Sequence, residues 1–132
     1  MTRTQILGCL ILLFATYLNN GGGIGGGAPF PANKLSVLIV EETEDRDDLP
    51  TSQVSAIESA IWREYVLSKG GEARVLEPEA KLSNEEPWVA PALAVKREKL
   101  PWLVISDGKR GYSGPLPENL DGLTAKLKEI GG

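Results

Sequence analysis

The residues with the clearest capacity for chemistry form an acidic segment, residues 41–48, with the sequence Glu-Glu-Thr-Glu-Asp-Arg-Asp-Asp. Six of these eight residues carry a carboxylate. Carboxylate oxygens are the hard ligands that Ca²⁺ and Mg²⁺ prefer, although the spacing and the glycine of an EF-hand are absent. The alternative is a solvated loop whose later acids favour the positive end of a following helix, with Arg46 balancing their charge. We favour the solvated loop and predict no bound metal ion or cofactor.

Side chains that commonly carry out catalysis are scarce elsewhere in the chain. There is no histidine, and the single cysteine, Cys9, lies in an apolar N-terminal run. The chain therefore has no imidazole base, and the region after that run has no thiol nucleophile. The serines form no nucleophile elbow, and the glycine run precedes the first predicted strand instead of forming a phosphate-binding loop. This inventory favours a protein that acts by binding over an enzyme.

The charge distribution narrows the class of partner. The chain of 132 residues carries a net charge of −4, and all of its 18 acidic residues follow residue 40. General binding to nucleic acids requires clustered Lys and Arg to neutralise phosphates. We therefore predict no nucleic-acid partner.

Residues 1–20 are typical of a targeting segment. Arg3 precedes an uncharged apolar run, Ile6 to Leu18, which is shorter than the roughly 20 residues of a typical membrane-spanning helix. Two alternatives stand, a cleaved signal peptide and an uncleaved membrane anchor, and Arg3 places the following domain outside the cytoplasm in both. Residues 21–32, rich in glycine and proline, are predicted to be a flexible linker. One folded domain is then expected at residues 33–132.

Beyond the linker, the hydrophobic pattern alternates between strands and helices. Short apolar runs predict strands at 35–40, 73–77 and 100–105, and Asp107-Gly108 predicts a hairpin turn into a strand at 109–112. One helix is expected after the acidic segment, from its apolar stripe of Val54, Ile57, Ile61 and Tyr65. A short helix at 90–98 and a final amphipathic helix ending near Ile130 complete the predicted order.

The C-terminal half carries a family resemblance. Pro101 opens a strand, Asp107-Gly108 turns it, and Gly114 and the final amphipathic helix follow. In this succession the chain resembles the thioredoxin-like superfamily, over roughly residues 35–132. The resemblance implies an α/β fold, specifically a three-layer α/β/α sandwich around a central four-stranded mixed sheet. It also implies a cis proline at Pro101, facing the loop that follows the first strand.

The chain departs from this family where thioredoxins carry out their chemistry. Thioredoxins place Cys-x-x-Cys between the first of these strands and the helix, where the helix N-terminus lowers the thiol pKa. The acidic segment stands there instead. The resemblance therefore implies a redox-inactive domain, similar to many uncharacterised bacterial and phage proteins.

These observations predict a binding site made of the acidic segment and the edge that faces it. We expect this exported or membrane-tethered domain to bind a protein partner. Membrane contact would come through the N-terminal segment if it is uncleaved. Two alternatives stand: a divalent-cation-binding protein or enzyme that uses residues 41–48, and a structural component of an envelope or virus-associated assembly. The candidate binding residues are Glu44, Asp45, Arg46, Asp47, Asp48, Pro101 and Trp102.

Overall fold

The computed structural model describes residues 27–132. The predicted signal peptide or anchor, Cys9 and the first part of the predicted linker lie outside these residues. Within the described part, no helix combines the length and the apolar character that a membrane crossing requires.

Four strands form one open mixed sheet in the order β3-β2-β4-β5. Their bounds are β2 (Ser36–Val40), β3 (Glu72–Leu76), β4 (Trp102–Ser106) and β5 (Gly111–Pro115). β2 pairs in parallel with β3 and antiparallel with β4, and β4 pairs antiparallel with β5. The two central strands, β2 and β4, are buried along their whole length, which explains their nearly continuous apolar sequences. The predicted α/β class and the four-stranded mixed sheet are confirmed.

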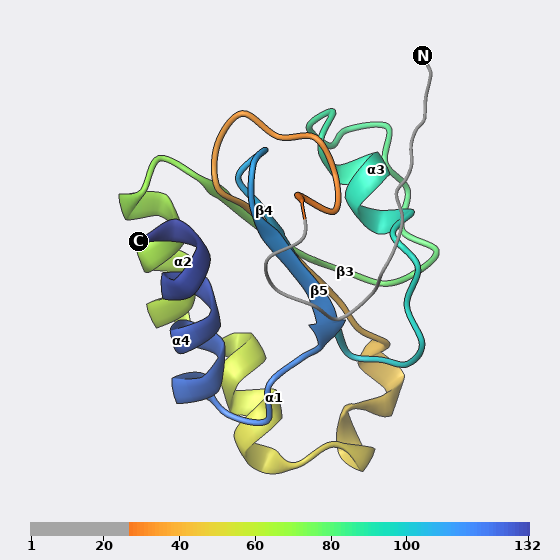
Figure 1. The fold of residues 1–132 in the computed structure, drawn as a ribbon. Coiled ribbons are helices and arrows are strands. Elements are labelled where there is room, and N and C mark those ends of the chain that lie inside the picture. Colours follow the sequence, from red (N-terminus) through yellow and green to blue (C-terminus); the bar gives the residue numbers. More distant parts are fainter. Residues whose placement is uncertain (1–26) are drawn as a thin grey trace.

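Helices cover both faces of this sheet (Figure 1). The helices α1 (Thr51–Glu58), α2 (Ala60–Ser68) and α4 (Leu120–Gly131) pack on one face, and the short α3 (Val89–Leu93) packs on the other. Alternate side chains of β2 serve the two faces, because successive residues of a strand point in opposite directions. Val37 and Ile39 join the core under the three longer helices, whereas Leu38 and Val40 join the core under α3.

The single helix expected over residues 54–65 is wrong, because the chain breaks at Ser59. The backbone of Ser59 is extended, with φ −69° and ψ 138°, and its side chain accepts a hydrogen bond from the N–H of Ile61. Ser59 thus ends α1 and caps α2. The break turns α2 so that Trp62 and Val66 face the core, while Ile61 is 59% exposed. Ile61, which the predicted apolar stripe included, therefore does not belong to the core.

The folded unit includes the last residues of the predicted linker. The ring of Phe30 is buried and stacks on that of Trp88, with the ring centroids 5.7 Å apart. The hydroxyl of Ser106 donates a hydrogen bond of 2.7 Å to the Phe30 carbonyl. Gly108, at φ +92°, lies so close to the same segment that an added Cβ would meet the Ala32 carbonyl oxygen at 2.0 Å. The hairpin turn therefore requires glycine for both its backbone conformation and its packing.

Candidate functional site

The acidic segment is largely a 3-10 helix, η2 (Thr43–Asp48), without buried residues. Arg46, in its middle, turns back toward the body of the protein. Its Nε donates to Glu41 Oε1 at 2.9 Å, Nη2 pairs with the other oxygen of Glu41, and Nη1 donates to Glu58 Oε2 at 2.7 Å. Glu41 is only 3% exposed, and a buried carboxylate is stable only when it is paired. Arg46 is therefore committed to neutralising Glu41 within the protein.

The other predicted residues of this segment face solvent. Glu44, Asp45, Asp47 and Asp48 are all exposed. They give this end of the molecule four carboxylates without a salt-bridge partner among the described residues. This surface is suited to attract a cationic group from solution.

The peptide bond between Leu100 and Pro101 is cis, as the family resemblance implies. Pro101 is buried, and its carbonyl accepts a hydrogen bond of 3.1 Å from the N–H of Leu116. This bond ties the start of β4 to the chain just beyond β5. Pro101 also lines an open cleft.

We call this cleft the proline cleft, because four of its lining residues are prolines. It has a volume of about 500 Å³, and its walls come from the chain after η2, the chain before β4, and β5 with the segment that follows it. The side-chain amide of the buried Gln53 donates to the carbonyls of Leu116 and Pro117, at 2.9 and 3.1 Å, which fixes two of these walls together. The lining residues are Leu49, Pro50, Gln53, Lys99, Leu100, Pro101, Tyr112, Pro115, Leu116, Pro117 and Glu118.

The structure separates Trp102 from this cleft. Trp102 is 4% exposed and packs in the core under α3, and its indole N–H donates to Ser113 Oγ at 2.9 Å. Pro101 and Trp102 are consecutive, so they point to opposite sides of the chain. The residues Glu44 to Asp48 also do not line the cleft, which begins at Leu49. The sequence thus identified one wall residue, Pro101, and the neighbouring acidic surface, but not the other walls.

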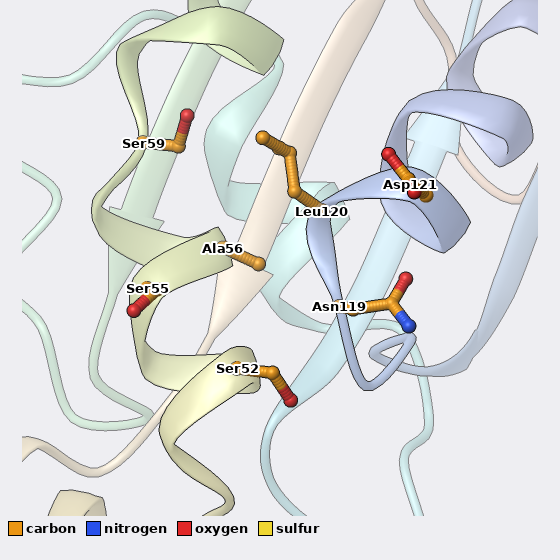
Figure 2. A pocket seen from close by; sticks show the side chains of 7 residues that line it. All are labelled: Ser52, Ser55, Ala56, Ser59, Asn119, Leu120 and Asp121. Atoms are coloured by element: carbon orange, nitrogen blue, oxygen red, sulfur yellow. The ribbon is translucent and has the colours of Figure 1, made fainter.

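A second hollow, of about 490 Å³, lies between α1, with Ser59 beyond its end, and the N-terminal end of α4. Figure 2 shows its lining side chains on the two facing helices. Several of its polar groups already have local partners: Ser52 donates to the Glu118 carbonyl, Ser59 caps α2, and Asn119 caps α4. This hollow was not predicted from the sequence, although Ser52, Ser55 and Ser59 recur at three- and four-residue steps along the chain. Its full lining is Ser52, Ser55, Ala56, Ser59, Asn119, Leu120 and Asp121.

Three carboxylates meet where the parallel strands β2 and β3 end. One oxygen from each of Glu42, Glu77 and Glu79 lies within 4.8 Å of the others. Partial burial, together with the negative charges of Glu77 and Glu79, raises the pKa of Glu42. Such oxygens could coordinate a divalent cation, although exposed carboxylates also gather without one. Glu42 belongs to the predicted acidic segment, whereas Glu77 and Glu79 join it only through the pairing of β2 with β3.

No protein-family model, curated protein or solved structure matches this chain. Its function therefore has to be inferred from the geometry of residues 27–132.

Proposed function

We propose that residues 33–132, together with the packed segment around Phe30, form a redox-inactive, thioredoxin-like domain that binds a protein partner by holding an extended segment of it in the proline cleft. The strand order β3-β2-β4-β5 supports this fold, as does the parallel pairing of β2 with β3. Helices on both faces of the sheet are compatible with the three α/β/α layers of that family.

The observation that carries the proposal is the proline cleft itself. Prolines have few conformations to lose, and Gln53 joins two walls by hydrogen bonds, so the cleft is formed before a ligand arrives. Its lining combines apolar side chains, chiefly proline and leucine, with the polar groups of Gln53, Lys99 and Glu118, as in many binding sites. An open cleft of about 500 Å³ accommodates a few side chains of an extended peptide.

The acidic surface of η2 specifies the charge of the partner. Glu44, Asp45, Asp47 and Asp48 are exposed and directly precede Leu49 in the cleft wall. Complementary charges accelerate encounter and fix the orientation of a ligand. The preferred segment therefore carries Lys or Arg beside the apolar residues that enter the cleft. The export or membrane tethering predicted from residues 1–20 would place this activity outside the cytoplasm.

Selection of peptides tests this function. A phage-displayed library of peptides is selected on the full chain, and the affinity of the enriched peptides is measured by fluorescence polarisation. Enrichment of apolar residues next to Lys or Arg is expected. Glu118→Trp, which fills the cleft from an exposed lining position, should weaken binding about tenfold or more, an energy of roughly 1.4 kcal/mol.

The matched control is Glu64→Trp, the same substitution at an exposed position of α2 that does not line the cleft. It should bind the selected peptides as the unmodified chain does. Equal binding by the unmodified chain, Glu118→Trp and Glu64→Trp would exclude the proline cleft as the binding site. A library without enriched peptides would exclude peptide binding as the function.

A second candidate function is divalent-cation binding, favoured by the approach of Glu42 to Glu77 and Glu79. Thermal melts after chelator treatment, with Ca²⁺, Mg²⁺ or Mn²⁺ added at millimolar concentration, test it. A cation at about 100 times its dissociation constant would add roughly 2.7 kcal/mol to the free energy of unfolding. That gain should disappear in Glu77→Gln, and a melting temperature indifferent to all three cations would exclude the site.

A further inference from the structure

The two outer strands of the sheet, β3 and β5, each have one edge without a strand partner among the described residues. Such an edge presents free N–H and C=O groups, which are a template for pairing with another extended chain. Proteins therefore cover or interrupt their sheet edges. The outer edges of β3 and β5 are protected against such pairing in different ways.

On β3, alternate backbone groups face away from the sheet. The N–H of Glu72 donates to Leu35, and the carbonyl of Leu76 accepts from Glu41, so both residues turn their backbone groups toward β2. Hydrogen bonding alternates along a strand, and Ala73 and Val75 consequently direct theirs outward. All five residues of β3 are partly exposed, which leaves this edge accessible.

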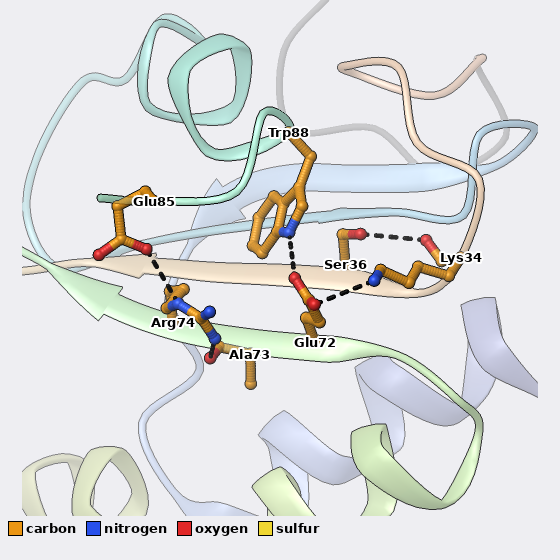
Figure 3. A network of polar contacts seen from close by, with 7 residues as sticks. All are labelled: Lys34, Ser36, Glu72, Ala73, Arg74, Glu85 and Trp88. Carbon is orange, nitrogen blue, oxygen red and sulfur yellow. Dashed lines mark hydrogen bonds and ion pairs between the residues drawn. The ribbon is translucent and has the colours of Figure 1, made fainter. Parts of the chain in front are cut away.

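One of these outward groups is occupied by a side chain of the same strand. Arg74 Nη1 donates a hydrogen bond of 2.9 Å to the carbonyl oxygen of Ala73 (Figure 3). Its Nε donates to Glu85 Oε1, also at 2.9 Å, and Glu85 lies in the segment that connects β3 to α3. Glu85 therefore holds the guanidinium over the backbone group that an incoming strand would need.

We propose that Arg74, held by Glu85, closes the outer edge of β3 against pairing with β3 of a second copy of this chain. Two β3 strands would pair antiparallel about a two-fold axis, with Ala73 of each opposite Val75 of the other. In that register the two Arg74 side chains lie directly opposite each other, and like charges in this position are destabilising. Removing Arg74 frees the Ala73 carbonyl and abolishes this repulsion in one change.

The edge of β5 does not depend on such a contact. Pro115, the last residue of β5, has no N–H to donate, so the row of free donors on this edge ends before it. For pairing with a second copy, β3 is therefore the edge that a single substitution makes available.

Sedimentation velocity of the full chain over a range of concentrations tests this proposal. Arg74→Ala should self-associate with a dissociation constant at least tenfold below that of the unmodified chain, and Glu85→Gln should show a smaller shift in the same direction. The matched control is Arg97→Ala, which removes the same charge and a comparable hydrogen bond, from Arg97 Nη1 to the Leu93 carbonyl. It should leave association unchanged. If Arg74→Ala and Glu85→Gln both sediment as the unmodified chain does, the proposal is overturned.

Amide hydrogen exchange locates the contact. In Arg74→Ala, the amides of Ala73 and Val75 should become protected as the protein concentration rises. Association without that protection would place the contact elsewhere and would also overturn the proposal. If Arg74→Ala fails to fold, Arg74→Lys replaces it, because a single ammonium lacks the fork that joins Glu85 to the Ala73 carbonyl. Its association should then exceed that of the unmodified chain, because the Ala73 carbonyl is freed, and an unchanged association would overturn the proposal.

Discussion

The two faces of the sheet are stabilised in different ways. The face under α1, α2 and α4 is covered by three helices, whose apolar side chains pack on alternate residues of β2 and β4. The face under α3 has a helix of only five residues. There the aromatic pair Phe30 and Trp88 completes the cover, and the indole N–H of Trp88 donates to Glu72 Oε1 at 2.6 Å (Figure 3).

This difference shows where the domain is sensitive to solution conditions. Apolar packing does not titrate, whereas Glu72 also accepts a bond of 2.9 Å from Lys34 Nζ and so joins the N-terminal segment, β3 and the start of α3. The bonds from Trp88 and Lys34 lower the pKa of Glu72. The first face should therefore govern overall stability, and the second should govern its dependence on pH.

The largest loss of stability is expected from a substitution on the face under α1, α2 and α4. Leu127 in α4 is fully buried, and Leu127→Ala should lower the free energy of unfolding by about 3–5 kcal/mol, because it removes packed atoms and leaves a cavity. Leu93→Ala in α3, at a side chain 8% exposed, should cost about 2 kcal/mol. Urea denaturation measures both values. A larger loss for Leu93→Ala would reverse the proposed ranking of the two faces.

A smaller effect is expected from the bond between Trp88 and Glu72. Trp88→Phe keeps a ring to stack on Phe30 but removes the donor to the carboxylate, and should cost about 1.5–3 kcal/mol at neutral pH. Because the folded-state pKa of Glu72 is lowered, its stabilisation is present above the ordinary pKa of glutamate and is lost as the pH falls through the folded-state value. The difference between Trp88→Phe and the unmodified chain should shrink below about pH 4.

A double-mutant cycle isolates this bond. Glu72→Gln keeps an acceptor for Trp88 but loses the charge, so the two substitutions together should cost less than the sum of their separate costs. Additive costs, or a difference that persists unchanged in acid, would mean that the charge of Glu72 does not strengthen its bond with Trp88.

The smallest effect is expected at Glu42, with the opposite sign. Its pKa is raised by partial burial and by Glu77 and Glu79, so ionisation destabilises the fold as the pH rises through that pKa. Glu42→Gln should slightly raise the melting temperature at pH 7, and this gain should vanish in acid. Melts at several pH values without divalent cations measure it. A lower melting temperature for Glu42→Gln at pH 7 would contradict the repulsion inferred here.

Much of the local structure could be predicted because it depends on near neighbours in the chain. The strand at Ser36–Val40 follows from its β-branched run, and the turn before β5 follows from Asp107-Gly108. The break at Ser59 could not be predicted from the apolar spacing of residues 54–65, which suits one continuous helix. The break at Ser59 places Trp62 in the core and leaves Ile61 exposed, and the apolar spacing does not distinguish these two side chains.

The features of the candidate sites also fall into two groups, those that depend on near neighbours in the chain and those that depend on tertiary structure. The sequence by itself determined the exposed acidic segment and Pro101, as well as the absence of imidazole and domain thiol chemistry, because these depend only on residue types and short spacings. Tertiary structure alone decided that Trp102 turns into the core, that Glu42 meets Glu77 and Glu79, and that residues near 50, 100 and 116 enclose one cleft. The physical reason is that strand pairing and register bring together residues that are far apart in the chain.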